Sequence, residues 1–453
     1  MTKAAIPSWR EVFHGRQGRL LVGLVGLETV GAIEALVAVT AMPAAARSLG
    51  HLALYGWVFA VPGLATVAAI PVAARDVDRA GARRSLAAMV VLLGGGTVLA
   101  GAAPDIGWLL AGRLLQGLGT GAQYAVGLGL IVRELPVAHR ARAFAILAGA
   151  WVLPGMVGPA AGGVLAATVG WRWAFWAFLP LVGIGTLLVW PLVGGRPRRS
   201  EAAAATSLRW SVQVAVAGAL VLGGITALTV WTVPLLALGS LLGLPAISRL
   251  SGGGQTAAPR ELRLALAMIA CLSVAFFAVN SFLPLLLTRV REEGLIVASL
   301  TITGSTLGWA GGSWWQSRAV ARWSARRLVA GGAAAVAAGT LGVTLVLLGA
   351  PPWIADGAWT VAGLGVGVAY PTVYLVATRA SRTAAASTTA GLVMLMDTLG
   401  AAAGAGLAGS GVALSTQAGR GIATGLVAVF GIAAAAALAV VALARVTAPG
   451  RAA

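Results

Sequence analysis

The stretch "ARDVDRAGARR" at residues 74–84 concentrates six charges in a chain in which only 10% of residues are charged. Long apolar runs lie on both sides of it and recur from Leu20 to Leu443. A run of about 18 apolar residues is long enough to cross the hydrocarbon core of a bilayer. The runs are continuous, whereas a transmembrane barrel would alternate apolar and polar residues. The sequence therefore predicts an all-α polytopic membrane protein.

The apolar runs give the limits of the expected helices. In the first half of the chain these are 19–43, 52–74, 86–104, 107–132, 143–169 and 173–194. In the second half they are 262–288, 295–317, 327–350, 353–378, 386–413 and 421–444. Between the halves, an apolar block at 211–248 is too long for one crossing and just long enough for a tight hairpin. We expect two crossings there, which gives 14 helices, with 12 helices as the alternative.

The chain divides into an N-terminal six-helix bundle at 1–200, a linker with the hairpin at 201–260, and a C-terminal six-helix bundle at 261–453. Two internal echoes support this division. "RDVDRAGARR" is echoed by "RAVARWSARR" at 318–327, and "GLGTGA" at 117–122 is echoed by "GLGVGVA" at 363–369. Repeated halves with a substrate site between them are typical of secondary transporters.

The basic residues are distributed unevenly about the expected membrane. The net charge of +19 by itself would be compatible with nucleic-acid binding. With the N-terminus inside, however, almost all basic residues fall in inner segments, and the outer loops contain only Arg47, Arg172, Arg289, Arg291 and Arg420. This is the positive-inside pattern. We therefore expect a multi-pass protein of a bacterial cell membrane with both termini cytoplasmic, and no nucleic-acid partner.

The charged stretch at 74–84 resembles the loop motif G-x-x-x-D-R-x-G-R-R of the major facilitator superfamily. The matching residues are Asp78, Arg79, Gly81, Arg83 and Arg84, whereas Ala74 and Ala82 depart from the motif. Gly81 permits a tight turn. The resemblance implies that this cluster holds the two halves together on the cytoplasmic side in the outward-facing state. The alternative is that these charges only set the membrane topology.

Three further segments resemble the 14-helix drug:proton antiporter branch of that superfamily. "RLLQGLGTGAQ" carries Arg113 and Gln116 of the fourth-helix motif, and "IEALVAVTAMP" carries Glu34 in place of the first-helix aspartate. "LPGMVGPAAGG" resembles the fifth-helix antiporter motif through Pro154, Gly158, Pro159, Gly162 and Gly163, with Pro154 standing where a glycine is expected. The resemblance covers nearly the whole chain and implies the major facilitator fold and multidrug efflux.

Four ionisable side chains fall within the expected helices: Glu28, Glu34, Arg113 and Asp397. Each costs about 2.5–3.5 kcal/mol or more at membrane depth, which makes it a functional candidate. At about 1.5 Å per residue, Glu34 lies roughly 13 Å and Arg113 roughly 9 Å below the outer boundary, so an arginine side chain can join them. We hypothesise that Glu34 exchanges the proton and that Arg113 biases its proton affinity. The alternative is a static pair that orders helix packing.

The roles of the other two carboxylates stay open. Glu28 lies about 120° around the helix from Glu34, so one of the two can face a cavity while the other packs. We expect Asp397 to contact substrate or carry a second proton, or alternatively to bond a neighbouring helix. Lower-ranked candidates for the cavity wall are the mid-helix residues Gln116, Gln123, Tyr124, Trp151, Asn280 and Tyr370.

The residues favour a transporter over an enzyme. The sequence shows no metal-ligand cluster, nucleotide-binding loop or nucleophile triad. We therefore expect no enzyme activity and no cofactor, and transport driven by a proton gradient, with sodium as the open alternative, and not by ATP. Three carboxylates against one arginine favour small lipophilic or cationic substrates. The leading interpretation is a monomeric proton-coupled exporter; the alternatives are a metabolite symporter or importer, and a lipid-handling membrane partner.

Overall fold

The computed structural model of the protein describes residues 13–50, 52–136, 139, 142–143, 146–147, 149–193, 204–227, 231–250, 259–380 and 386–446. These residues are helical apart from short turns, and ten of their helices are long and apolar enough to cross a membrane. The expected polytopic helical fold is confirmed.

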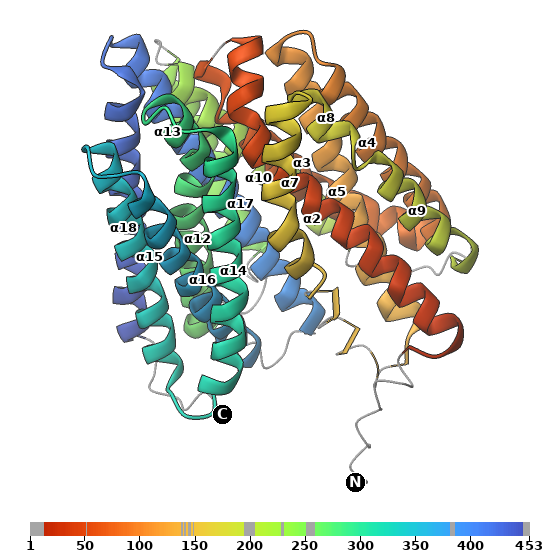
Figure 1. The fold of residues 1–453 in the computed structure, drawn as a ribbon. Coiled ribbons are helices and arrows are strands. Elements are labelled where there is room, and N and C mark those ends of the chain that lie inside the picture. The colour runs from red at the N-terminus through yellow and green to blue at the C-terminus, as the bar shows by residue number, and fades with distance from the viewer. Residues whose placement is uncertain are drawn as a thin grey trace.

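The first bundle is built from the first half of the chain (Figure 1). Its helices are α2 (Gly15–Leu49), α3 (Trp57–Arg79), α4 (Ala82–Ala102), α5 (Ile106–Glu134), α7 (Val152–Thr168), α8 (Trp171–Trp176) and α9 (Leu179–Val189). Gly81 has a φ of 91°, a conformation that glycine adopts readily, and it makes the tight turn from α3 to α4. The Asp105 side chain caps α5 by accepting hydrogen bonds from the backbone N–H groups of Gly107 and Trp108.

The second bundle follows a two-helix hairpin. The hairpin consists of α10 (Ala204–Ala227) and α11 (Thr232–Leu250). The bundle consists of α12 (Arg260–Asn280), α13 (Leu283–Arg289), α14 (Leu295–Ala319), α15 (Ala325–Leu347), α16 (Trp353–Ala380), α17 (Ala386–Gln417) and α18 (Gly421–Val446). Helices α8 and α9 form one interrupted span, as do α12 and α13, so the sixteen described α-helices agree with the larger of the two expected counts, 14. Helix α10 packs on α3 of the first bundle and on α17 of the second.

Two expected membrane spans differ from the structure because each contains an internal proline. The span expected at 173–194 is interrupted between α8 and α9, just before Pro180, and the span expected at 262–288 is interrupted between α12 and α13, just before Pro284. Proline has no N–H to donate and its ring crowds the preceding turn. The span expected at 143–169 is described as a helix from Val152, where α7 begins; several residues between 137 and 148 lie outside the described part.

The glycine echo in the sequence corresponds to equivalent helix crossings in the two bundles. In the first bundle, a Cβ on Gly117 would overlap the backbone of α3, and one on Gly119 would overlap α4. In the second bundle, a Cβ on Gly363 would overlap α14, and one on Gly365 would overlap α15. Small residues let helices approach closely. Helices α5 and α16 therefore occupy the same position in their respective bundles.

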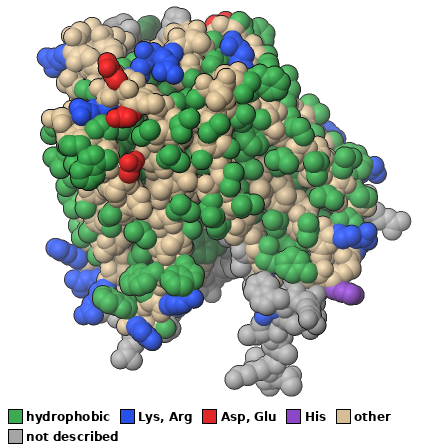
Figure 2. All heavy atoms as spheres, viewed as in Figure 1, with side chains coloured by type: hydrophobic (Ala, Val, Ile, Leu, Met, Phe, Trp, Pro, Cys, Tyr) green, Lys and Arg blue, Asp and Glu red, His purple; other side chains and the backbone are tan. Residues whose placement is uncertain are grey.

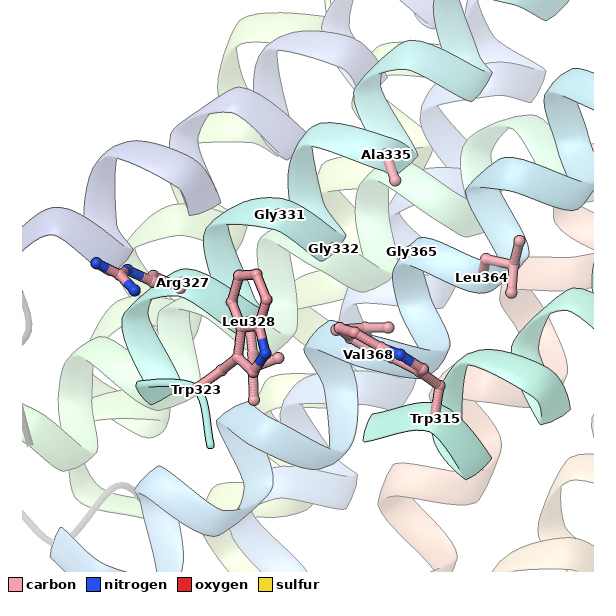
Figure 3. Close-up of a pocket in the computed structure, with 10 residues that line it drawn as sticks. All are labelled: Trp315, Trp323, Arg327, Leu328, Gly331, Gly332, Ala335, Leu364, Gly365 and Val368. Carbon is pink, nitrogen blue, oxygen red and sulfur yellow. The ribbon is translucent and has the colours of Figure 1, made fainter. Parts of the chain in front are cut away.

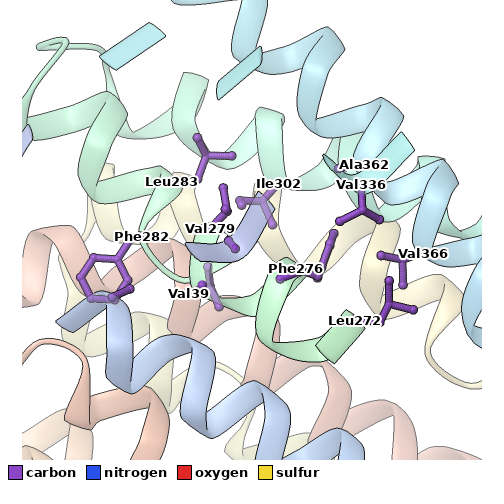
Figure 4. Packing of buried hydrophobic residues seen from close by; sticks show 14 of the residues in the cluster. Val39, Leu272, Phe276, Val279, Phe282, Leu283, Ile302, Val336, Ala362 and Val366 are labelled. Atoms are coloured by element: carbon purple, nitrogen blue, oxygen red, sulfur yellow. The ribbon is translucent and has the colours of Figure 1, made fainter. Parts of the chain in front are cut away.

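The largest group of buried apolar side chains draws on both bundles (Figure 4). Most of its members come from the second bundle, where Phe276 stacks on Trp359 with ring centroids 4.9 Å apart. Val39 of α2 belongs to the same cluster. Tyr55 of the first bundle meets Phe282 of the second edge-to-face at 4.9 Å. Aromatic contact of this kind stabilises the junction beyond the area it buries.

The two bundles touch at one end of the molecule. We call the end with Gly15 and Val446 the termini side and the opposite end the far side. In the far halves of their helices, a Cβ on Gly56 of α3's N-cap would overlap Gly409 of α17, and one on Gly163 of α7 would overlap Ser299 of α14. At the termini side the described helices of the two bundles diverge (Figure 1). The described parts of the bundles are therefore in closer contact on the far side than on the termini side.

Substitution of Gly163 tests this far-side contact. In the Gly163→Leu variant, the new side chain meets Ser299 and keeps α7 and α14 apart. Spin labels attached to cysteines at Arg47 and Arg420, in a Cys271→Ser background, should then report longer distances between the bundles than in the otherwise unchanged protein. Gly95→Leu is the matched control, because a Cβ there meets no atom within 4 Å. Unchanged label distances in Gly163→Leu would contradict the close contact described above.

Candidate functional site

Glu34 and Arg113 form an ion pair inside the first bundle. The Arg113 Nη1 atom lies 3.4 Å from Glu34 Oε1, and their side chains are 7% and 12% exposed. Arg113 also donates from Nε to the Val58 carbonyl at 3.0 Å and from Nη1 to Gln116 Oε1 at 2.9 Å. Gln116 in turn donates to Thr97 at 3.0 Å. One network thus joins α2, α3, α4 and α5, and it brings together the two residues that their expected depth placed within reach.

The two members of this pair differ in how many partners they have. Arg113 has two neutral acceptors besides the carboxylate. The only hydrogen bond described for the Glu34 side chain comes from Arg113. If Glu34 takes up a proton, the guanidinium keeps the Val58 and Gln116 acceptors, which satisfy its N–H groups but supply no counter-charge. A change of charge at Glu34 therefore leaves Arg113 as a buried cation without its ion pair, which is costly.

Glu28 forms a separate network in the same bundle. It is 8% exposed, and its two oxygens accept hydrogen bonds from Trp151 Nε1 at 2.9 Å and Gln123 Nε2 at 3.2 Å. Both donors are neutral. The 120° separation around α2 accordingly gives Glu28 and Glu34 different neighbours, and both carboxylates are held by other helices of the first bundle.

Asp397 lies in the second bundle and is also held by neutral donors. Its carboxylate accepts a hydrogen bond from Ser273 Oγ of α12 at 2.5 Å and a second from the hydroxyl of Tyr370 on α16. Ser273 was not predicted as a partner of Asp397, because it is one of many small residues in an apolar run. Both options raised for Asp397, a neighbouring-helix bond and a proton or substrate role, are compatible with these contacts.

Two tyrosines lie in the neighbourhood of the Glu28 and Asp397 sites. Tyr124 of the first bundle is near enough to both carboxylates to be affected by their charge, and Tyr370 of the second bundle donates a hydrogen bond to Asp397. Both tyrosines stand at the same place in the repeated pattern Gly-Leu-Gly-x-Gly-x-x-Tyr, which begins at Gly117 in α5 and at Gly363 in α16. The extended pattern is therefore a sequence signal for this pair as symmetry-related residues.

Two of the candidate cavity residues are instead engaged inside a single bundle. Gln116 is 1% exposed and belongs to the Arg113 network. Asn280 is 5% exposed and accepts a hydrogen bond from Trp359 Nε1 at 3.1 Å within the second bundle. A polar side chain in an apolar helix needs a partner, and here the partner lies in the bundle core and not between the bundles.

The charged loop at 74–84 makes its described contacts within the first bundle. Asp76 pairs with Arg84 at 3.5 Å and accepts a hydrogen bond from Ser85 at 2.7 Å. The Arg83 guanidinium lies over the ring of Trp190, 4.6 Å from its centroid.

The predicted role of Asp78, the acidic residue of the loop motif, stays a prediction. The side chain of Asp78 lies outside the described part of the structure, and Arg79 is exposed. Sequence reasoning overlooked Asp76, although it stands two residues before Asp78.

The glycine-rich motif of α7 lies between the two bundles. All five of its named residues are buried: Pro154, Gly158, Pro159, Gly162 and Gly163. A Cβ on Gly162 would press against α2, which carries both glutamates, whereas Gly163 faces α14 of the second bundle. The motif therefore packs α7 between the glutamate-bearing helix α2 and α14 of the second bundle.

The chemistry available to these sites is proton exchange or cation binding. Among the described residues, no group of three or more His, Cys, Asp and Glu could hold a metal ion. The three buried carboxylates lie in separate networks, and only Glu34 has a cationic partner.

Comparison with known proteins identifies the family. The model of the Major Facilitator Superfamily matches residues 29–405. The "Acurin A biosynthesis cluster MFS-type transporter" of Aspergillus aculeatus is 31% identical over 186 residues, which cover 41% of this chain and 34% of that protein. A "Probable multidrug-efflux transporter" of Mycobacterium tuberculosis is 30% identical over 188 residues, which cover 42% and 40%. The chain thus spans well under half the length of these relatives.

Solved structures show the same fold at low sequence identity. A bacterial homologue of the human lysosomal transporter Spinster, in an inward-facing and unoccupied conformation, superposes with a TM-score of 0.66 at 16% identity, covering 95% of this chain and 97% of the other. An auto-inhibited peptide transporter of the POT family gives 0.68 at 16% identity, covering 94% and 97%. The family match, the repeated bundles and the fold agree, and the chain belongs to the Major Facilitator Superfamily.

Proposed function

We propose that the protein is a proton-coupled antiporter that exports small lipophilic or cationic compounds by alternating access. The observation that carries this proposal is the Glu34–Arg113 pair, in which the buried carboxylate has one described partner and the arginine has three. Efflux-type relatives at about 30% identity support the direction of transport.

The pair links proton occupancy to helix position. When Glu34 is charged, its attraction to Arg113 in apolar surroundings holds α2 against α5. When Glu34 is protonated, that attraction is lost while Arg113 stays bonded within α3 and α5. Helix α2 is then free to shift, and it contacts α7, which contacts α14 of the second bundle. A proton can thereby bias the equilibrium between a state closed on the far side and a state closed on the termini side.

Glu28 and Asp397 supply the charge for a cationic substrate. Each accepts hydrogen bonds only from neutral donors among the described residues, so each lacks a counter-charge. A bound cation would provide one, and the rings of Tyr124 and Tyr370 offer faces for cation–π contact. A proton neutralises the same carboxylates. Competition between proton and cation for one set of carboxylates is sufficient for obligatory exchange.

The arginine distribution sets the proposed orientation. We place the termini side in the cytoplasm of a bacterial cell, because the basic loops cluster there. The described helices of the two bundles then diverge toward the cytoplasm, from which substrate would load. The energy source is the proton gradient and not ATP, and the working unit is a monomer.

Neutralising Glu34 should uncouple transport. Proteoliposomes that contain the pH dye pyranine are given tetraphenylphosphonium as a cationic probe, and proton movement is recorded. Glu34→Gln should reduce probe-induced proton flux about tenfold or more, because the side chain can no longer change charge. Asp105→Asn is the matched control: it replaces an exposed helix-capping carboxylate with another good cap.

Three results would oppose the proposal. Undiminished proton-driven transport in Glu34→Gln removes the role of this residue. Protons that move in the same direction as the probe would indicate a symporter. Probe transport that depends on a sodium gradient and not on a pH gradient would identify sodium as the coupling ion.

Asp397 should matter for charge recognition. Asp397→Asn should weaken tetraphenylphosphonium binding to the purified protein about tenfold, corresponding to about 1.4 kcal/mol, because it removes the charge but keeps the hydrogen-bonding shape. Binding is measured by equilibrium dialysis. Asp356→Asn is the control in the same bundle, since Asp356 is bonded to Thr301 at the far side, away from the tyrosines. Equal affinity of the wild type and Asp397→Asn would exclude Asp397 from the cation site.

A further inference from the structure

A groove opens on the outer surface of the second bundle, away from the space between the bundles. It lies among the termini-side parts of α14, α15 and α16 and has a volume of about 260 Å³ (Figure 3). None of its lining residues belongs to the Glu28, Glu34 or Asp397 networks. Its occupant is therefore separate from a substrate bound between the bundles.

The groove has depth because its floor is made of glycine. A Cβ on Gly331 would meet no atom within 4 Å, so the space above this residue is empty. Gly332 and Gly365 bring α15 and α16 into backbone contact directly beside it. A larger residue at either of these two positions would push the helices apart, whereas one at Gly331 would fill the groove.

The walls of the groove are aromatic and face the surroundings of the protein. Trp315 and Trp323 are 45% and 48% exposed, and their ring centroids lie 6.4 Å apart. Both stand near the termini-side ends of apolar helices, where tryptophan favours the boundary between lipid tails and headgroups. The opening of the groove therefore lies at the headgroup level of one leaflet.

The groove is lined almost wholly by apolar surface, with one basic residue at its rim. Arg327 stands at one edge with its guanidinium directed away from the other lining residues, while Leu364 and Ala335 lie at the opposite edge (Figure 3). Along α15, about 12 Å separates the levels of Arg327 and Ala335, at about 1.5 Å per residue. A ligand that fits has a negatively charged head at the membrane surface and an apolar tail that runs inward.

The surroundings of Arg327 are strongly basic. Arg318, Arg322 and Arg326 lie in the same segment and are exposed. None of the ion pairs among the described residues involves any of these four arginines. Basic side chains gather beside apolar ones at this end of the bundle in Figure 2. Each arginine near a membrane surface raises the affinity for an anionic lipid about fivefold.

We propose that this groove binds an anionic phospholipid of the leaflet on the termini side. Its phosphate lies at the rim beside Arg327, and one acyl chain lies against Trp315 and Trp323 and covers Gly331. A free phosphate could pair with the arginine, but it would leave the apolar lining of the groove uncovered. The volume is close to the lower limit of about 300 Å³ for ligand pockets, which suits part of one chain and not a whole lipid.

Native mass spectrometry of the detergent-purified full chain tests the site. The probes are phosphatidylglycerol and phosphatidylcholine with identical acyl chains, and inorganic phosphate alone. We expect one phosphatidylglycerol to bind the wild type at least about fivefold more tightly than phosphatidylcholine. Gly331→Leu should abolish this bound lipid. Gly431→Leu is the matched control, because a Cβ at this α18 glycine also meets nothing within 4 Å.

A second variant separates the headgroup from the chain. Arg327→Gln should leave the chain contact intact and lower the preference for phosphatidylglycerol about fivefold, with the protein folded as in the wild type. The proposal is overturned if the two lipids bind equally, if phosphate alone competes as well as the lipid, or if Gly331→Leu and Gly431→Leu behave alike. These outcomes do not depend on whether the protein exports cations.

Discussion

The structure depends on one constraint: a charge within the hydrocarbon layer must be compensated by the protein itself. Among the described residues, Arg113 is the only basic residue in the middle of a membrane-spanning helix. It pairs with Glu34 and donates hydrogen bonds to Val58 and Gln116. Satisfying it draws four helices of the first bundle onto one point. Glu34 is the charged partner of Arg113, whereas Val58 and Gln116 are neutral. A single proton on Glu34 would therefore remove the ion pair.

The second bundle repeats the helices of the first without repeating its charge. Trp359 stands four residues before Gly363, as Arg113 stands four residues before Gly117. Trp359 is fully buried, donates to Asn280 and stacks on Phe276. The equivalent crossing is thus held by a neutral hydrogen bond and aromatic packing. The proposed ion-pair switch is consequently in the first bundle, while Asp397 is the carboxylate that the second bundle contributes to the proposed proton–cation competition.

Glycine lets the two bundles approach closely on the far side. Gly56 and Gly409 bring two backbones together, Gly163 lies against the Ser299 side chain, and Tyr55 and Phe282 form an aromatic pair. Small residues at such crossings permit close van der Waals contact between helices. The hairpin helix α10 touches α3 and α17 at once, so it lies across the line along which the bundles separate.

The sequence by itself determined the membrane class, the order of the helices and the family resemblance, because apolar length and the cost of buried charge act within a single segment. It also placed Glu34 within reach of Arg113, since depth follows from residue count. The choice of 14 helices over 12, the partners of Glu28 and Asp397, and the close contact of the bundles on the far side were decided only by the tertiary structure. These features depend on how helices distant in sequence cross, and side-chain direction at a crossing is set by packing and not by spacing along the chain.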